Sequence, residues 1–359
     1  SAGWRPQPGS YQMDATQADI YLVSRADRSV VVGRPYIYLA VDTATHLIAG
    51  AYVGFACDET AVMACILQAA SDKVEYCARY GIDITPEQWP SVGMPSEIIT
   101  DQGREFFGPR MAELCRRYGL EVLTLPPFRP DQKGTVEKSI DLLQARYKPM
   151  LRGRGVIEDD AQERWATDYR AQAVLDLDDF ARIVIHSILY LNSGRLVGGR
   201  TPAQAWLEMS PRLMAVDPQE LYIQTLPRDT AKLTRKGLRV NRMWYIPDDA
   251  ADLTIGESYT IAYDPSDLRC IHIILNDRAC PCHTVGVGHP LSAYEANAVH
   301  KSAKVYTQTA QMKETAASIT ATQAIRTIVE QADSRKEPIR QIDGDKIEAD
   351  RLTEGRRLT

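Results

Sequence analysis

Three acidic residues occupy positions where carboxylates can share one catalytic task. Asp14 lies in a predicted strand, within the phrase Gln-Met-Asp-Ala-Thr, and Asp101 directly follows the short predicted strand 96–100. Glu137 lies in the first turn of a helix predicted over residues 134–148. A single acid at a strand end usually serves a turn, and a single acid in a first helical turn usually serves the helix dipole. Together, with Gly and Lys residues flanking them, the three predict a shared site.

The chemistry that suits three carboxylates is metal-dependent attack on a phosphodiester. This attack places negative charge on the phosphate and on the leaving 3′ oxygen, and two Mg²⁺ ions about 3.5–4 Å apart can activate one oxygen and stabilise the other. Mg²⁺ prefers carboxylate and water oxygens, and Mn²⁺ accepts similar ligands. We therefore expect two Mg²⁺ ions, with Mn²⁺ as a substitute. Asp14, on a central strand, is assigned to bridge both ions, whereas Asp101 and Glu137 hold one each.

Other acids near these positions have simpler interpretations. Asp42 ends a neighbouring strand and could face the metals, but the phrase Asp-Thr-Ala-Thr favours a turn role. Asp19 flanks the site in sequence only. Glu105 is expected to support the loop after Asp101 rather than to bind metal.

The order of predicted elements positions these acids. Strands are expected over 12–22, 34–42, 46–55, 96–100 and 121–125, and amphipathic helices from Asp58 and over 111–118, 134–148 and 177–191, with a short helix after Thr201-Pro. Three strands followed by helices that alternate with two more strands give a mixed α/β sheet covered by helices. This is the element order of a ribonuclease-H-like fold.

Beyond residue 216 the apolar residues occur in shorter and more closely spaced runs. Short apolar runs at close intervals, among them 221–223, 238–240, 243–246, 259–263 and 271–275, predict a small β-barrel. The Ala-, Gln-, Lys- and Thr-rich stretch that follows predicts a helix, and the charged end is expected to lack fixed structure alone. The expected segments are a catalytic core (1–150), its helical extension (151–215), the barrel (216–290), a helical segment (291–333) and a flexible charged tail (334–359).

Basic residues near the acids and in the barrel are candidates for contact with DNA phosphates. Arg129, Lys133 and Lys138 surround Glu137, although solvated surface charge is the alternative. In the barrel, Arg228, Lys232, Arg235, Lys236, Arg239 and Arg242 stand against one acid, Asp229. Such a concentration predicts a surface that follows phosphates, and a merely solvated hairpin is the alternative.

Composition narrows the class of protein. Of 359 residues, 44% are hydrophobic and 25% charged, and no apolar run approaches the length of about 20 residues that a membrane helix requires. The net charge of −5 neither supports nor excludes DNA binding, because affinity depends on where the cations lie. Seven scattered cysteines and the absence of a signal peptide predict reduced thiols in a cytoplasm. Cys270, Cys280, Cys282 and His283 lack the paired spacing of a zinc site.

Several phrases together resemble a known family. Asp14, the phrase Ile98-Ile-Thr-Asp-Gln-Gly-Arg-Glu-Phe106 and the phrase Arg129-Pro-Asp-Gln-Lys-Gly-Thr-Val-Glu137 resemble the DDE signature of retroviral integrases and related transposases. The similarity is greatest to the phage Mu transposase group, and within it to the B subunit of Tn-seven-type transposons (TnsB-like). It covers about residues 10 to 290, since 41–45, 237–245 and 263–268 also contribute.

The resemblance implies a DNA transposase that cleaves transposon 3′ ends with water and transfers the freed 3′-OH ends into target DNA. It further implies a homo-oligomer on paired ends, an AAA+ ATPase partner for target selection through the C-terminal tail, and a possible partner endonuclease. A bacterial cytoplasm, with nucleoid association when active, is expected. The chain begins with Ser, so we expect domains that read the end sequence to precede it. The rival interpretations are a nuclease of the same fold that does not join strands, and a non-catalytic DNA-binding assembly protein.

Overall fold

The computed structural model describes residues 6–101, 103–124, 130–158, 168–276, 278–285, 292–335 and 344–355, without the side chains of 130–133, 344–348 and 355. The chain forms two compact units, residues 1–300 and residues 301–359. This division is coarser than the five segments expected from the sequence, whose boundaries stay predictions.

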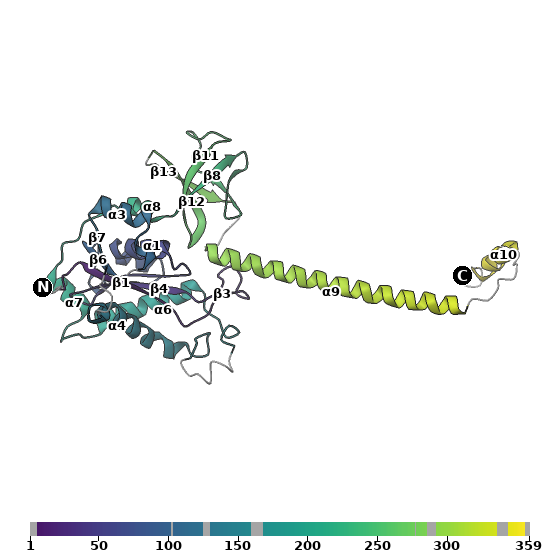
Figure 1. Ribbon diagram of the computed structural model, residues 1–359, viewed down its shortest axis with the longest axis horizontal. Coiled ribbons are helices and arrows are strands. Elements are labelled where there is room, and N and C mark those ends of the chain that lie inside the picture. The colour runs from purple at the N-terminus through teal and green to yellow at the C-terminus, as the bar shows by residue number, and fades with distance from the viewer. Residues whose placement is uncertain are drawn as a thin grey trace. The chain divides into compact units, whose positions relative to one another are not determined.

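A five-stranded mixed sheet lies at the centre of the first unit (Figure 1). Its strands are β1 (Ser10–Gln17), β4 (Tyr36–Asp42), β5 (Ile48–Gly54), β6 (Glu97–Thr100) and β7 (Glu121–Thr124), in the order β5-β4-β1-β6-β7. The first three strands along the chain pair antiparallel, and β6 and β7 add in parallel on the other side of β1. The small hairpin of β2 (Leu22–Val23) and β3 (Val31–Gly33) lies between β1 and β4 in sequence. The ribonuclease-H-like sheet expected from the sequence is confirmed.

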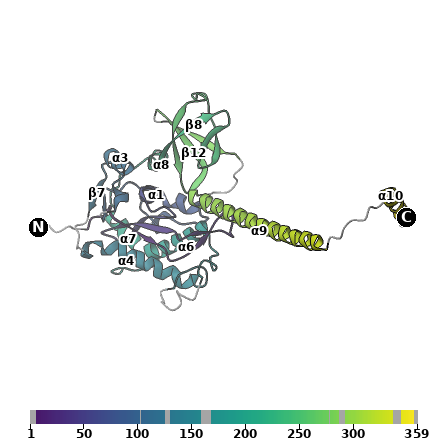
Figure 2. The same ribbon diagram turned by 45° about the vertical axis from the view of Figure 1, so that its right-hand side comes forward.

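Helices cover both faces of this sheet, and each face has its own apolar core. In both views α1 (Glu59–Ala70) and α3 (Pro109–Tyr118) lie above the sheet, and α4 (Pro130–Tyr147) and α6 (Leu177–Leu189) below it (Figures 1 and 2). Tyr11 and Met13 of β1 pack in the cluster with α1 and α3. Residues of β4 pack in the cluster with α4 and α6, where the Tyr147 and Phe180 rings meet at 5.3 Å. Tyr11 and Met13 therefore face the layer of α1 and α3, and the residues that alternate with them in β1 face the layer of α4 and α6.

Local signals explain where several helices begin and end. The carboxylate of Asp58 accepts a hydrogen bond from the Thr60 N–H, so α1 begins with the predicted cap. Helix α3 ends at Gly119 in the left-handed conformation. Thr201 caps α7 (Pro202–Met209), and its side chain and that of Gln204 form a reciprocal capping box.

Three expected element assignments were wrong. Helix α4 begins at Pro130, not at residue 134, because a proline suits the first helical turn and the helix continues through Gly134. The run 221–223 belongs to helix α8 (Pro218–Thr225), which the Asp217 carboxylate caps, and not to a strand. Within the charged tail, residues Gly344–Gly355 form helix α10.

The predicted barrel is present and closed. Its strands are β8 (Arg228–Thr234), β9 (Gly237–Val240), β10 (Met243–Pro247), β11 (Ser258–Asp264), β12 (Asp267–Leu275) and β13 (Arg278–Thr284), and they close in the order β10-β13-β12-β11-β8-β9. Leu238, Tyr245, Ile261 and Ile271 are fully buried in its core. The Tyr245 hydroxyl donates to the Leu268 carbonyl at 2.7 Å, which satisfies its one polar atom.

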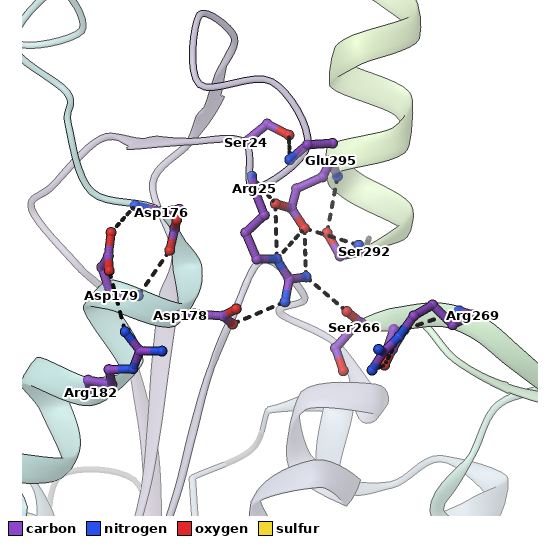
Figure 3. A network of polar contacts seen from close by, with 12 residues as sticks. Ser24, Arg25, Asp176, Asp178, Asp179, Arg182, Ser266, Arg269, Ser292 and Glu295 are labelled. Carbon is purple, nitrogen blue, oxygen red and sulfur yellow. Dashed lines mark hydrogen bonds and ion pairs between the residues drawn. The ribbon is translucent and has the colours of Figure 1, made fainter. Parts of the chain in front are cut away.

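A buried ion pair joins the domain of the mixed sheet, the barrel and the start of the long helix that follows the barrel (Figure 3). Arg25, in the β2–β3 connection, donates to the fully buried Glu295 carboxylate at 2.7 Å, to the Asp178 carboxylate at 3.1 Å and to the Ser266 carbonyl at 3.1 Å. Glu295 and Ser292 form the capping box that begins α9 (Ala293–Ser334). One guanidinium therefore links β2, α6, the β11–β12 turn and α9.

The second unit begins within α9 and contains α10. Its side chains that the structure describes are all exposed, including the apolar Val305, Met312, Ile319 and Ile328. None of the helices in the described part of the chain is long and apolar enough to cross a bilayer.

Candidate functional site

Asp14 and Asp101 lie on the two neighbouring central strands of the sheet. β1 and β6 pair in parallel, with Gln12 opposite Ile99 as the last registered pair. Both aspartates lie two positions beyond this pair, so continuing the register sets Asp14 opposite Asp101. Neighbouring strands are about 4.8 Å apart, and residues at the same register point to the same face. The sheet therefore brings the two aspartates to one face and one end of a strand pair.

Helix α4 crosses this same face and carries Glu137. The Gln12 side-chain oxygen accepts from the Val136 N–H at 3.3 Å, and the Gln144 amide donates to the Thr16 hydroxyl at 3.2 Å. Gln12 and Thr16 flank Asp14 at two-residue spacing, so all three share the face of β1 toward α4. Glu137 directly follows Val136 and lies two helical turns before Gln144, on the same side of the helix. The helix thereby directs Glu137 toward the part of β1 that carries Asp14.

The three carboxylates are accessible. Asp101 and Glu137 are exposed and Asp14 is half-buried. One oxygen of Asp14 accepts from the Ala15 N–H at 2.9 Å, and one of Asp101 accepts from the Gly103 N–H at 3.0 Å. Among the described residues, no three side chains of the types Asp, Glu, His and Cys form a group that could hold one metal ion. The structure thus brings together the two strands and the helix that carry the three acids. The three carboxylates are not arranged in it as ligands of one ion.

The other acids have the structural roles expected of them. Asp42 is fully buried and accepts from the N–H groups of Gly9 and Thr45 at 2.7 and 2.8 Å and from the Thr45 hydroxyl at 2.7 Å. Its burial raises its pKa, although these hydrogen bonds oppose the shift. Asp19 forms ion pairs with Arg34 and Lys148. The turn interpretation of Asp42 is confirmed.

Glu105 lies beside the loop that follows Asp101, and its predicted supporting role there stays a prediction. Its carboxylate lies against the backbone of Gly103, so closely that a Cβ at this glycine would meet the carboxylate at 2.8 Å. Gly103 is the residue whose N–H binds Asp101. A side chain at position 103 would therefore require the Glu105 carboxylate to move.

The structure describes only some of the basic residues predicted to surround Glu137. Lys138 is an exposed residue of α4, one position after Glu137. Lys133 lies in the first turn of α4, and its side chain is outside the described part of the chain. Arg129 lies outside the described residues altogether.

The basic residues of the barrel divide into two places. Arg235 and Lys236 form the two-residue turn between β8 and β9, and Arg242 lies in the β9–β10 turn with Asn241, where both residues have positive φ. The Arg239 guanidinium lies 5.9 Å from the ring centre of Trp244. We call Arg235, Lys236, Arg239, Arg242 and Trp244 the basic corner. All five are exposed, and a hollow of about 460 Å³ opens between Lys236, Arg242 and Trp244.

Arg228 and Lys232 lie outside the basic corner. Arg228 begins β8, about 20 Å along the strand from the β8–β9 turn at 3.3 Å per residue. Its guanidinium donates to the Ile223 carbonyl of α8 at 3.2 Å, and partial burial lowers its pKa. Lys232 is exposed in the middle of the strand. The structure thus places four of the six predicted basic residues of the barrel in the basic corner.

Two of the three barrel cysteines are core residues, and Cys270 is half-buried. Cys280 and Cys282 are buried in the barrel core, and burial raises the pKa of the Cys282 thiol to about 12. The His283 ring nitrogen contacts the Asp248 carboxylate at 2.8 Å. No metal-binding group that includes them exists among the residues described.

Sequence reasoning did not single out Gln12, Thr16 or Gln144 for their contacts with α4 or β1. The signal was the alternation of polar residues at 12, 14 and 16 with the apolar residues at 11, 13 and 15, because it marks one polar face. It also missed Asn192, whose buried amide bonds both the N–H and the C=O of Ile48 at 2.9 and 3.0 Å. Asn192 thereby satisfies backbone groups at the edge strand β5.

The chain thus combines a ribonuclease-H-like sheet, with α4 across the face that carries Asp14, and a small closed barrel. Residues 12–153 match the family model of the TnsB C-terminal domain. The chain is 30% identical over 294 residues to the transposon Tn7 transposition protein TnsB of Escherichia coli, covering 74% of this chain and 42% of that protein. The resemblance to TnsB-like transposases is therefore confirmed.

Other similar proteins are more distant. The transposase for transposon Tn552 of Staphylococcus aureus is 20% identical over 275 residues, covering 74% of this chain and 52% of that protein. Among solved structures, the catalytic core domain of BIV integrase matches with a TM-score of 0.33 and 21% identity, covering 57% of this chain and 97% of that one. The chain spans about half the length of the two transposition proteins.

Proposed function

We propose that this chain is the catalytic part of a DDE-type DNA transposase that cleaves transposon 3′ ends and transfers the 3′-OH ends into target DNA. The observations that support the proposal are the register of β1 and β6, which pairs Gln12 with Ile99 two positions before Asp14 and Asp101, and the two hydrogen bonds that hold α4, the helix of Glu137, against β1. The transposase relatives support the same class of reaction.

The donor set fits divalent Mg²⁺, with Mn²⁺ as a substitute. Three carboxylates, two of them exposed and one half-buried, supply the hard oxygen ligands that this ion prefers. Asp14 would contribute to both of two ions, and Asp101 and Glu137 to one each. When bound, such a pair lowers the cost of forming the attacking oxygen and of releasing the 3′ oxygen.

The chain's own residues would orient the DNA for this chemistry. Lys138 extends from α4 beside Glu137, and Lys133 and Arg129 precede it, so phosphates near the scissile bond have basic partners there. The basic corner of the barrel offers a second contact, with Trp244 available to stack on a sugar or base. Two separate contacts fix the register of the duplex, whereas one would let it rotate.

The assembly expected of a TnsB-like protein is also part of the proposal. We propose a homo-oligomer on paired ends, an AAA+ ATPase that binds the C-terminal tail, and a possible partner endonuclease for the second strand. The exposed apolar and charged residues of the second unit offer surface for such contacts.

Strand transfer from a pre-cut end tests the reaction. The chain, Mg²⁺, a duplex with a free 3′-OH transposon end and a supercoiled target should give joined products. Asp14→Asn, Asp101→Asn and Glu137→Gln should each abolish joining yet leave binding of this duplex nearly unchanged. Hydrolysis without joining would indicate the nuclease, and normal joining by Asp101→Asn would indicate that the acids have no catalytic role.

A matched control lies one helical turn after Glu137. Asp141 is an exposed acid of the same helix. Asp141→Asn removes the same charge as Glu137→Gln, but from a position displaced by one turn. It should leave joining within about twofold of the parent chain. Equal loss in both variants would assign the effect to the charge of α4 and not to a ligand.

A further inference from the structure

Two hydrogen bonds fasten α4 to the polar face of β1, and they flank the proposed carboxylates. One joins the Gln12 oxygen to the Val136 N–H at 3.3 Å, and the other joins the Gln144 amide to the Thr16 hydroxyl at 3.2 Å. Gln12 is 1% exposed, so this contact is shielded from water. The first bond reaches the helix backbone one residue before Glu137, and the second lies two turns later.

The first bond is the one that controls the position of Glu137. It ends on a main-chain N–H, so it fixes the helix itself rather than one rotamer of a neighbouring side chain. An N–H inside a helix ordinarily donates to the carbonyl four residues earlier, so Val136 has an alternative acceptor within α4. The bond to Gln12 is therefore dispensable for forming the helix. Its specific effect is to hold this turn against β1 beside Asp14.

We propose that Gln12 is a positioning residue that sets the metal affinity of the site by fixing Glu137 against Asp14. The proposal rests on the function proposed above. A Mg²⁺ ligand must lie about 2.0–2.1 Å from the ion in near-octahedral geometry. A shift of the helix by a fraction of an ångström therefore weakens binding. Partners that orient carboxylate ligands typically contribute 10- to 100-fold in metal affinity.

The chain contains a chemically matched control. Gln68 of α1 is also a buried glutamine whose side-chain oxygen accepts a strand N–H, that of Ala51 in β5, at 2.8 Å. It fastens a helix to the sheet as Gln12 does, but β4 separates its strand from β1. Ala51 belongs to a strand and has no helical carbonyl to return to, so loss of Gln68 leaves a buried N–H unsatisfied.

The test compares Gln12→Met with Gln68→Met in the whole chain. Three quantities are measured: Mn²⁺ binding by electron paramagnetic resonance without DNA, the Mg²⁺ concentration that half-saturates strand transfer, and the thermal midpoint. Gln12→Met should raise both metal concentrations about 10-fold, recover joining at saturating Mg²⁺ and lower the midpoint little. Gln68→Met should lower the midpoint and leave both metal concentrations unchanged.

Other outcomes separate the two proposals. If Gln12→Met lowers the thermal midpoint without changing either metal concentration, Gln12 is only a packing residue and the inference is wrong. Should Gln12→Met fail to fold, Gln12→Asn keeps the amide but is one methylene too short to reach Val136, and the same expectations apply. Normal joining by Glu137→Gln would instead overturn the proposed function, whatever Gln12 does.

Discussion

Two parts of the first unit are fastened to its central sheet in opposite ways. The barrel and α9 are joined to it through Arg25 and the fully buried Glu295, with charged hydrogen bonds as short as 2.7 Å. Helix α4, which carries Glu137, is joined to β1 by neutral hydrogen bonds of 3.3 and 3.2 Å. Charged hydrogen bonds in a buried site are roughly twice as strong as neutral ones.

The difference shows that a buried ion pair holds the barrel and α9, whereas weaker neutral hydrogen bonds hold the turn of Glu137. A strong joint suits the barrel, because the proposed DNA contact of the basic corner requires a fixed place relative to the carboxylates. Weaker hydrogen bonds suffice for α4, because Val136 and Ile140 also pack this helix into the core beneath the sheet. The following experiments test this contrast.

The largest effect is expected at the joint of the barrel. Glu295→Ala leaves Arg25 buried without its main partner, and breaking a buried ion pair costs about 3–5 kcal/mol. Urea unfolding should show this loss, with Arg25→Ala similar and the double variant less than additive. Asp267→Asn, which removes the exposed pair with Arg269, is the matched control and should cost at most about 1 kcal/mol. Equal losses of unfolding free energy in Glu295→Ala and Asp267→Asn would mean that the buried ion pair contributes no more than the exposed one.

The same joint should be sensitive to acid. Burial alone would raise the pKa of Glu295, but the hydrogen bonds and charge of Arg25 outweigh it and lower that pKa. A carboxyl with a lowered folded pKa contributes stability above its unfolded pKa of about 4.3, and loses it as the pH falls through the folded pKa. The stability difference between the parent chain and Glu295→Gln should therefore be constant near neutral pH and shrink below about pH 4. A difference that grows on acidification would contradict the ion pair.

A feature of this fold could be predicted from the sequence where the pattern that indicates it lies within a few neighbouring residues. The strand of Asp14 and the short strand before Asp101 were predictable, because alternation and apolar runs are local. The cap of α1 at Asp58 and the end of α3 at Gly119 were predictable for the same reason. The start of α4 was not, because Pro130 and Gly134 indicate either a loop or a first turn, and only packing decides.

Contacts between distant residues could not be predicted from periodicity. Arg25 and Glu295 are 270 positions apart, and nothing near either one indicates a buried partner. Gln12 and Val136 are separated by 124 positions, and their bond depends on how α4 lies on the sheet. The sequence shows the basic residues of the barrel as one cluster. The positions of the strands and turns in the structure are needed to separate Arg228 from the basic corner.

A smaller effect is expected where α4 meets β1. Thr16→Val keeps the shape of the side chain but removes the acceptor of the Gln144 amide, and a neutral hydrogen bond contributes about 0.5–1.5 kcal/mol. Urea unfolding should show a loss in that range, whereas Thr16→Ser, which keeps the hydroxyl, should be closer to the parent chain. A loss above about 3 kcal/mol would place this contact on a level with the Arg25 joint and remove the contrast.

The smallest effect is expected at the basic corner of the barrel, the proposed second contact with DNA. Lys236→Ala removes one exposed cation of the basic corner, so the slope of log affinity against log salt should fall by about 0.9, the release expected for one phosphate contact. Arg228→Ala is the control, because its guanidinium is bound to the Ile223 carbonyl at the far end of β8 and should leave the slope unchanged. Fluorescence anisotropy with a labelled end duplex at several salt concentrations measures both slopes. If the two variants lower the slope equally, phosphates follow the whole strand, and the basic corner is not a separate contact.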